Sequence, residues 1–294
     1  MRVFLYIVTT LILVSCQKEI EFKGDDAEIQ MVLNGSIVAG ENASIQVSMS
    51  KSILEDPTDY QPIENATVAL LNLTDNTTES LTHTELGNYS TTNTLIEEGK
   101  EYQLSVEQSS FSSVSATQTI PYVTPIINVD TNTGTHFGED YFDININFYD
   151  EPTTSNYYEV RLLSGFYSYK IDTTTWEVDS VLEYGSLWFN SFDPIFENKG
   201  RGGDKLLISD EVLTSSNYTL NISIEDYNRP VGGSITIMLN SVSEAYYQYF
   251  ESADMQREKA FFSTSEGVPV YSNTSNGYGV LGSYNTDTKT IKIN

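Results

Sequence analysis

The sequence predicts a mostly β protein in two consecutive parts. A β-sandwich is expected over residues 27–122, followed by a larger antiparallel β domain over residues 126–294 with one amphipathic helix near 241–257. Three observations predict this. Short runs of strand formers are separated by turn residues, later runs alternate strictly between apolar and polar residues, and one stretch repeats its apolar residues at helical spacing. The chain's 294 residues are enough for one large or two ordinary domains.

The start of the chain predicts export and lipid attachment. Arg2 precedes a mostly apolar run over residues 3–14, and Ser15 and Cys16 follow it to complete the motif Leu13-Val14-Ser15-Cys16. A basic start, an apolar stretch and small residues at the cut site are typical of a secretory signal, and a cysteine directly after them is typical of a bacterial lipoprotein. The alternative, a transmembrane helix, would need about 20 apolar residues. We therefore expect residues 1–15 to be a signal peptide, Cys16 to carry the lipid and residues 16–26 to form a tether.

The residues after Cys16 bear on location. Gln17-Lys18-Glu19 is polar and resembles the export tag that sends lipoproteins of Bacteroidota to the outer face of the outer membrane. A plain tether would also be polar here. We expect a lipid-anchored protein of the outer membrane that faces the cell exterior, and the choice between inner and outer leaflet stays open.

The charge and the cysteine content of the chain exclude some classes of partner and of site chemistry. The chain has 41 Asp and Glu against 15 Lys and Arg, a net charge of −26. Such a field repels nucleic acid and anionic lipid surfaces, so no nucleic-acid partner is expected. Cys16 is the only cysteine, and its lipidation would leave no thiol for disulfides, metal ligation or nucleophilic catalysis.

The first β part is predicted from its strand and turn residues. Residues 66–71 are rich in strand formers, Gly87-Asn88-Tyr89 marks a turn, and residues 102–106 alternate between apolar and polar. Pro121 and Pro125 close the segment. These patterns look like the immunoglobulin-like or transthyretin-like modules of bacterial surface proteins, so we expect an immunoglobulin-like β-sandwich.

The second β part is predicted from strict alternation. Residues 143–148, 158–162, 218–224 and 234–237 each alternate between apolar and polar, as strands of an antiparallel sheet with one solvated face do. The helix is predicted by an apolar stripe at i, i+3, i+4, i+7, i+8 and i+11, with a capping box at 241–244. The stripe comprises Val242, Ala245, Tyr246, Tyr249, Phe250 and Ala253. Packing against the sheet is the expected use, and a partner groove is the alternative.

The sequence predicts no catalytic, cofactor or metal site. The spacing of Gly277, Gly279 and Gly282 matches a dinucleotide fingerprint, but a final strand rather than a helix follows, so we expect these glycines to permit bending or close approach. His83 and His136 lie in different predicted parts, and neither G-x-S-x-G nor H-E-x-x-H is present.

Carboxylates are abundant without forming an obvious acid/base couple. The densest pairs, Asp150-Glu151 and Asp210-Glu211, are chain neighbours, and neighbours on a strand point to opposite faces. Glu139 and Asp140 with Asp143 form a weak calcium candidate. We expect no enzymatic activity, while a carboxylate hydrolase remains the third-ranked hypothesis.

Aromatic residues concentrate between 164 and 198, where both tryptophans lie. Exposed aromatic platforms bind sugars or peptides by stacking and apolar burial, whereas buried ones simply fill a β domain. The ligand-binding candidates are Tyr167, Tyr169, Trp176, Tyr184, Trp188 and Phe189. The cation-rich, glycine-rich stretch 198–205 is expected to be a flexible connector, with contact to an anionic group as the alternative.

Several motifs together resemble the Bacteroidota lipoprotein family labelled domain of unknown function 4249. The most specific is the tail, Ser272-Asn273 followed by Gly277-Tyr278-Gly279-Val280-Leu281-Gly282-Ser283-Tyr284. The others are residues 31–35, 64–68, 208–213, 246–249 and 270–273. One departure lies before Pro269, where Ser265-Glu266-Gly267-Val268 replaces the Asn-Pro-Phe-like turn more frequent in the family.

The resemblance implies a companion of transporters powered through the TonB system, and it carries over no catalytic residues. The first hypothesis is therefore a surface lipoprotein that captures or gates a nutrient, with a β-barrel transporter as partner and the aromatic segment holding a glycan or peptide. A structural or adhesive surface protein is the alternative.

Overall fold

The computed structural model describes residues 28–51, 60–171, 174–176, 178–193, 196, 203–213, 215–260 and 268–293. The expected signal peptide, Cys16 and the tether over 16–26 lie outside these described residues, as do residues 265–267 of the departure before Pro269. In the described part of the chain, no helix has the length and apolar character needed to cross a bilayer.

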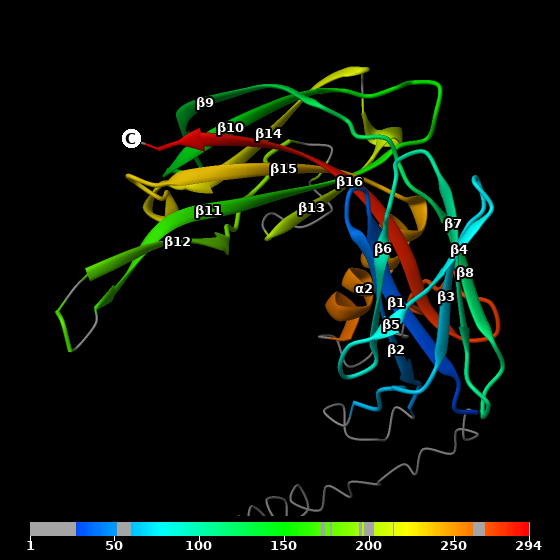
Figure 1. The fold of residues 1–294 in the computed structure, drawn as a ribbon. Helices are drawn as coiled ribbons and strands as arrows, with labels where there is room; N and C mark the ends of the chain where they lie inside the picture. Colours follow the sequence, from blue (N-terminus) through cyan, green and yellow to red (C-terminus); the bar gives the residue numbers. More distant parts are fainter. Residues whose placement is uncertain are drawn as a thin grey trace, which may run out of the picture.

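One long sheet runs through the molecule (Figure 1). Its described strands are hydrogen-bonded in the order β12-β11-β15-β16-β1-β2-β6-β5, and β13 also pairs with β11. The bounds are β1 Met31–Val38, β2 Asn42–Met49, β5 Thr82–His83, β6 Asn88–Leu95, β11 Tyr157–Ile171, β12 Val178–Ser186, β13 Lys205–Ser209, β15 Ser234–Val242 and β16 Tyr278–Lys292.

Two smaller sheets accompany the long one. The first has the order β4-β3-β7-β8, with β3 Thr67–Asn72, β4 Thr77–Ser80, β7 Glu101–Glu107 and β8 Val114–Thr119. The second has the order β14-β10-β9, with β9 Ile126–His136, β10 Glu139–Tyr149 and β14 Asn217–Glu225. The fold is therefore mostly β, which confirms the predicted class of an immunoglobulin-like β-sandwich followed by a larger antiparallel β part.

Each smaller sheet buries one core against the long sheet. Alternation produces these cores: in β10, Ile144, Ile146 and Phe148 are buried, as every second residue of a one-sided strand should be. The second core also contains Val160 of β11 and Ile237 of β15. The first core joins β1, β2 and β6 to β3, β7 and β8 through Leu33, Val47, Tyr89, Val68, Leu104 and Val114.

The final strand, β16, takes part in both halves. Its residues 278–284 pair in parallel with β1, and residues 284–292 pair antiparallel with β15. Leu281 belongs to the first core and Ile291 packs against the second. The predicted division at 122–126 assigns all of this strand to the second part. The structure places its first half in the N-terminal sandwich instead, because β1 offers it a hydrogen-bonding edge.

Helix α2 (Glu244–Ala260) packs on the long sheet, where Leu207, Val242, Tyr246 and Tyr247 form a third cluster. The helix begins later than the capping box predicts. Ser243 is the capping residue, since its Oγ accepts from the backbone N–H of Tyr246 at 3.3 Å. Ser241 still belongs to β15, and its Oγ accepts from Thr124 N at 3.0 Å.

Candidate functional site

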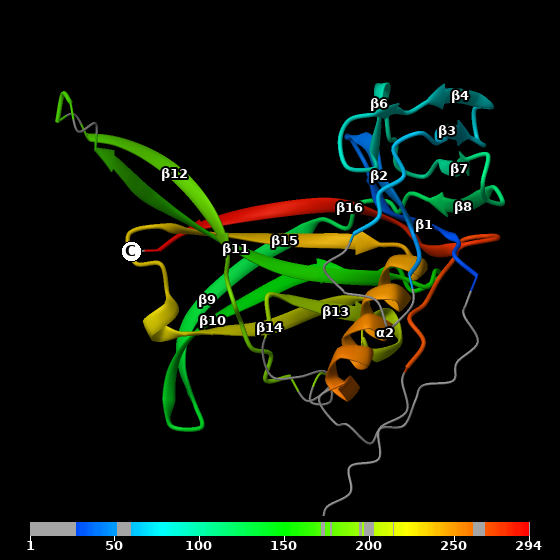
Figure 2. The ribbon, with the colours of Figure 1, turned by 90° about the horizontal axis from the view of Figure 1, so that it is seen from below.

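Strands β11 and β12 leave the long sheet together as a two-stranded ribbon. Strand β11 pairs with β15 only as far as Gly165, opposite Ser234, whereas its pairing with β12 continues to Ile171 and Val178. We call residues 165–171 and 178–185 the aromatic ribbon. It projects from the body of the molecule at the outer end of the sheet (Figure 2).

One face of the aromatic ribbon is apolar and solvent-exposed. Residues directly opposite each other in an antiparallel pair share a face, and the register pairs Gly165 with Tyr184, Tyr167 with Leu182, Tyr169 with Ser180 and Ile171 with Val178. The large side chains of this face are Tyr167 (58% exposed), Tyr169 (69%), Ile171 (57%), Val178 (63%), Leu182 (42%) and Tyr184 (57%). Contiguous exposed apolar side chains make this face a candidate interaction site.

At the root of the ribbon, where β11 leaves β15, two glycines each face an aromatic ring of the opposite strand. A Cβ on Gly165 would lie 3.2 Å from the ring of Tyr184, and one on Gly185 would lie 3.5 Å from the ring of Phe166. Each glycine is thus covered by a ring from the opposite strand, a device that supports glycines within strands. Two residues after Phe166 on β11, Ser168 donates across the ribbon from its Oγ to Glu183 Oε1 at 2.7 Å.

The structure distributes the six sequence-predicted binding residues over three places. Tyr167, Tyr169 and Tyr184 lie together on the ribbon face. Trp176 lies near the tip, 76% exposed, with a left-handed φ of 60° that aromatic residues rarely adopt. The remaining two, Trp188 and Phe189, lie beyond the root, outside the ribbon.

Trp188 and Phe189 have opposite environments because alternation continues past β12. Trp188 is 67% exposed, whereas Phe189 is only 3% exposed and belongs to the second core. The sequence predicts Phe189 as a binding residue, and the structure corrects this to a core position, with Phe189 also among the residues that line a surface cleft.

That cleft, here named the Trp188 cleft, has a volume of about 330 Å³. It forms because Asn190 exchanges two backbone hydrogen bonds of 2.8 Å with Ser223, which holds this segment beside the end of β14. The short helix η3 (Asp226–Asn228) follows β14. The lining residues are Trp188, Phe189, Asn190, Glu225, Tyr227 and Asn228.

Tyr227 is the residue that sequence reasoning missed. It is 82% exposed at the cleft, and its hydrogen bond to the carboxylate of Glu225 raises the pKa of its phenol. The signal available in the sequence was a lone aromatic residue in a polar turn after the alternating run 218–224. Nothing local indicated that this turn would meet Trp188.

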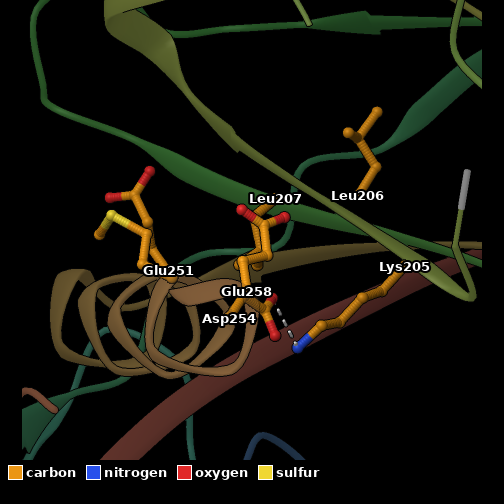
Figure 3. Close-up of a pocket in the computed structure, with 7 residues that line it drawn as sticks. Lys205, Leu206, Leu207, Glu251, Asp254 and Glu258 are labelled. Carbon is orange, nitrogen blue, oxygen red and sulfur yellow. Dashed lines mark ion pairs between the residues drawn. The ribbon is translucent and has the colours of Figure 1, made fainter. Parts of the chain in front are cut away.

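A second cavity, of about 300 Å³, lies between β13 and α2 (Figure 3). Its lining residues are Lys205, Leu206, Leu207, Glu251, Asp254, Met255 and Glu258. The Lys205 side chain is 14% exposed, with Nζ 3.7 Å from Asp254 Oδ2 and 3.9 Å from the centre of the Phe250 ring. Burial lowers the pKa of Lys205. Lys205 itself begins strand β13, while residues 198–202 of the predicted connector lie outside the described part.

A buried polar network joins α2 to the sheet. Glu159 is fully buried, and its carboxylate accepts from Arg161 Nε at 2.7 Å and Nη2 at 3.0 Å. Asn240 Nδ2 donates to it at 2.9 Å, and the hydroxyl of Tyr246 donates at 3.0 Å. Burial and the nearby Glu159 charge raise the pKa of Tyr246. Every member is hydrogen-bonded, which is typical of a network that positions elements.

The histidines and the calcium candidate have structural partners. His136 Nε2 lies 3.1 Å from Asp143 Oδ1, which also accepts from Ser223 Oγ at 2.7 Å. Asp140 Oδ1 accepts from Thr135 Oγ1, and His83 Nε2 accepts from Gly87 N. Among the described residues, no group of three or more His, Cys, Asp or Glu is placed to hold a metal ion.

In the two acidic pairs, 150–151 and 210–211, the aspartates Asp150 and Asp210 both accept hydrogen bonds from Asn156. Asp150 Oδ1 accepts from Asn156 Nδ2 at 3.1 Å and from Tyr158 OH at 2.6 Å. Asp210 Oδ2 accepts from Asn156 N at 2.7 Å.

Comparison with known proteins gives the family. The model of the family described as domain of unknown function (DUF4249) matches residues 17–290. The chain belongs to the DUF4249 family. This confirms the family suggested by the tail motif.

Other comparisons add little to the DUF4249 assignment. No match is found among curated proteins. The chain is similar to a solved structure titled "Crystal structure of DIP-gamma IG1+IG2", with 12% identity over 88% of this chain and 98% of that chain. The TM-score is 0.20, too low to carry any argument about this chain.

The tail motif that pointed to DUF4249 has a structural role. A Cβ on Gly279 would lie 2.1 Å from the Leu33 carbonyl oxygen, and Asn34 Oδ1 accepts from Val280 N at 3.3 Å. Asn273 clamps Leu281, donating to its carbonyl and accepting from its N–H, both at 2.9 Å. The predicted role of close approach for these glycines is confirmed at Gly279, and the motif defines the joint between β16 and β1.

Proposed function

We propose that this DUF4249 protein is a non-enzymatic surface lipoprotein. In this proposal Cys16 anchors it to the outer membrane, where it serves a TonB-dependent β-barrel transporter in nutrient uptake. It holds its protein partner through the aromatic ribbon. The observation that carries the proposal is the exposed face of Tyr167, Tyr169 and Tyr184 on strands that project from the sheet.

The physical support lies in what an isolated ribbon requires. A two-stranded ribbon is marginally stable in water by itself. A partner that covers its apolar face would contribute a favourable free energy of about 25 cal/mol for each Å² of apolar surface that it buries. Tyrosine and tryptophan are also the side chains that most often dominate binding energy at protein interfaces.

The support for the location lies in the sequence. The lipoprotein signal Leu13-Val14-Ser15-Cys16 ends at Cys16, and the family match begins at residue 17, directly after it. The transporter partner is drawn from the family resemblance.

The test is a pull-down of the tagged native lipoprotein in gentle detergent, with mass spectrometry of its partners. The wild type is expected to recover a TonB-linked barrel in stoichiometric amount. Tyr167→Ser combined with Tyr169→Ser should lose the barrel, whereas Tyr122→Ser, at a tyrosine 71% exposed but outside the ribbon, should retain it.

Two results would contradict the proposal. Recovery of the barrel by the ribbon variant would place the interface elsewhere. Recovery of the lipoprotein alone, or only with matrix proteins, would favour the alternative of a structural or adhesive surface protein.

A further inference from the structure

The Trp188 cleft combines exposed rings with polar groups of a particular kind. Trp188 and Tyr227 are 67% and 82% exposed, and they come from separate segments of the chain. Glu225, Asn190 and Asn228 complete the polar lining. The cleft's volume of about 330 Å³ lies within the range of roughly 300–1,000 Å³ usual for small-ligand sites.

These groups match the chemistry of a pyranose ring. A sugar has one face of C–H bonds, which packs on an aromatic ring, and a rim of hydroxyls that both donate and accept hydrogen bonds. Carboxamides offer donors and acceptors, and a carboxylate offers acceptors only. Indole and phenol rings provide flat apolar surface with polar edges. Both parts of a sugar therefore find partners in one cleft.

Charge selects among sugars. Among the residues that the structure describes, the lining contains the carboxylate of Glu225 and neither Lys nor Arg, and the chain has a net charge of −26. An anionic sugar would meet like charge without a cationic partner, which disfavours it. An acidic peptide is disfavoured for the same reason.

We infer that Trp188, Tyr227 and Glu225 form the binding site for a neutral hexopyranose unit of a glycan. For its biological setting this inference rests on the proposed uptake role, since it names the chemical class of the cargo. The sugar site and the ribbon face have no residue in common, so each can be altered without substituting a residue of the other.

The test uses the purified lipoprotein in a detergent without a sugar headgroup. The chain has two tryptophans, so Trp176→Phe leaves Trp188 as the single tryptophan, and excitation at the red edge of the indole band excludes the tyrosines. The probes are the neutral hexasaccharides maltohexaose, cellohexaose, laminarihexaose and mannohexaose, with the anionic hexagalacturonate for comparison. At least one neutral probe is expected to shift the Trp188 emission, and hexagalacturonate is not.

Calorimetry with the neutral probe that binds then locates the site. Tyr227→Ala and Trp188→Ala should each weaken binding about tenfold or more, since each removes a stacking surface. Glu225→Gln should weaken binding without a change in unfolding temperature. Trp176→Ala is the matched control, an exposed tryptophan outside the cleft, and it should bind as the wild type does.

Unchanged Trp188 emission across the neutral probes would overturn the inference, as would equal losses for Trp176→Ala and Trp188→Ala. The result is separable from the proposed function. Loss of the barrel in the Tyr167→Ser, Tyr169→Ser variant with sugar binding intact supports both claims. A missing barrel in the wild type with intact sugar binding refutes the transporter role alone.

Discussion

The ring of Tyr184 lies across Gly165, its direct partner on the neighbouring strand, at the residue where β11 parts from β15. A Cβ on Gly165 would lie 2.5 Å from Ser234 Oγ and 3.2 Å from the Tyr184 ring. The glycine therefore provides the space in which the ring packs, and the ring in turn shields the backbone where the ribbon begins. This contact sets the geometry of the root.

Gly165→Val is expected to destabilise the protein by about 1–3 kcal/mol, because an overpacked site forces neighbouring side chains off their rotamers. Gly185→Val is the matched control on the partner strand, where a Cβ would make an ordinary contact of 3.5 Å with Phe166. Its effect should stay within about 0.5 kcal/mol. Urea unfolding measures both free energies of unfolding. Equal losses in the two variants would show that the packing of the Tyr184 ring does not require a glycine at position 165.

Gly279→Ala should weaken the joint between β16 and β1. Gly279 has a φ of 109°, and an added Cβ would lie 2.1 Å from the Leu33 carbonyl oxygen. Gly138 is the control, since its φ is 89° and a Cβ there meets nothing within 4 Å. Gly138→Ala should cost about 1–2 kcal/mol from backbone strain alone.

The further loss of unfolding free energy in Gly279→Ala, beyond that in Gly138→Ala, would measure the clash with the Leu33 carbonyl. Because β16 contributes Leu281 to one core and Ile291 to the other, amide hydrogen exchange should show faster opening of both cores in that variant. Faster exchange confined to β1 and β2 would contradict the idea that β16 couples the two halves.

The network under α2 makes Glu159 costly to remove singly. Glu159→Ala leaves the half-buried guanidinium of Arg161 without its carboxylate and should cost about 3 kcal/mol or more. The double variant Glu159→Leu, Arg161→Met removes both charges and should lie closer to wild type in its urea midpoint. A double variant as unstable as the single one would show that the pair stabilises the fold by itself.

Glu79 is expected to titrate at unusually low pH. Hydrogen bonding at Thr94, then at the backbone of Thr92 and Asn93, lowers the pKa of its carboxyl to about 2. Oε1 accepts from Thr92 N at 2.8 Å and Oε2 from Thr94 N at 2.8 Å. Carbon-detected NMR titration of this side chain measures the pKa directly.

The lowered pKa of Glu79 makes the stability of the folded protein depend on pH. The folded pKa lies below the unfolded value, so the stabilisation from Glu79 is present above about pH 4.5 and declines as pH falls toward 2. Glu79→Gln should remove this part of the acid dependence. An unchanged acid profile would contradict the role assigned to the hydrogen bonds at Thr92 and Thr94.

Much of the fold could be predicted because its signals are local. The alternation in residues 143–148 identified the core of β10, and the apolar spacing from 245 to 250 identified α2. The capping box places the start of the helix too early, because Ser241 and Ser243 are both residue types that cap helices. Only the extent of β15, which runs to Val242 and includes Ser241, leaves Ser243 as the cap.

The candidate sites were only partly predictable. Alternation in β11 and the abundance of tyrosine indicated an aromatic surface at Tyr167 and Tyr169. The sequence could not show that the pairing of β11 with β15 stops at Gly165, opposite Ser234, which is why those rings lie on a projecting ribbon and not over a sheet. The same reasoning missed Tyr227, whose meeting with Trp188 depends on the bridge between Asn190 and Ser223.

The sequence by itself determined the strand and helix periodicities, the acidic balance, the expected lipid anchor and the family resemblance, since each depends on residue types and their spacing and not on which segments meet in space. The tertiary structure alone decided that residues 278–284 complete the N-terminal sandwich and that Trp188 lines a cleft with Tyr227. The physical reason is that strand pairing uses backbone groups common to every residue. Which edge a strand finds is therefore decided by the packing of whole sheets rather than by the strand's own sequence.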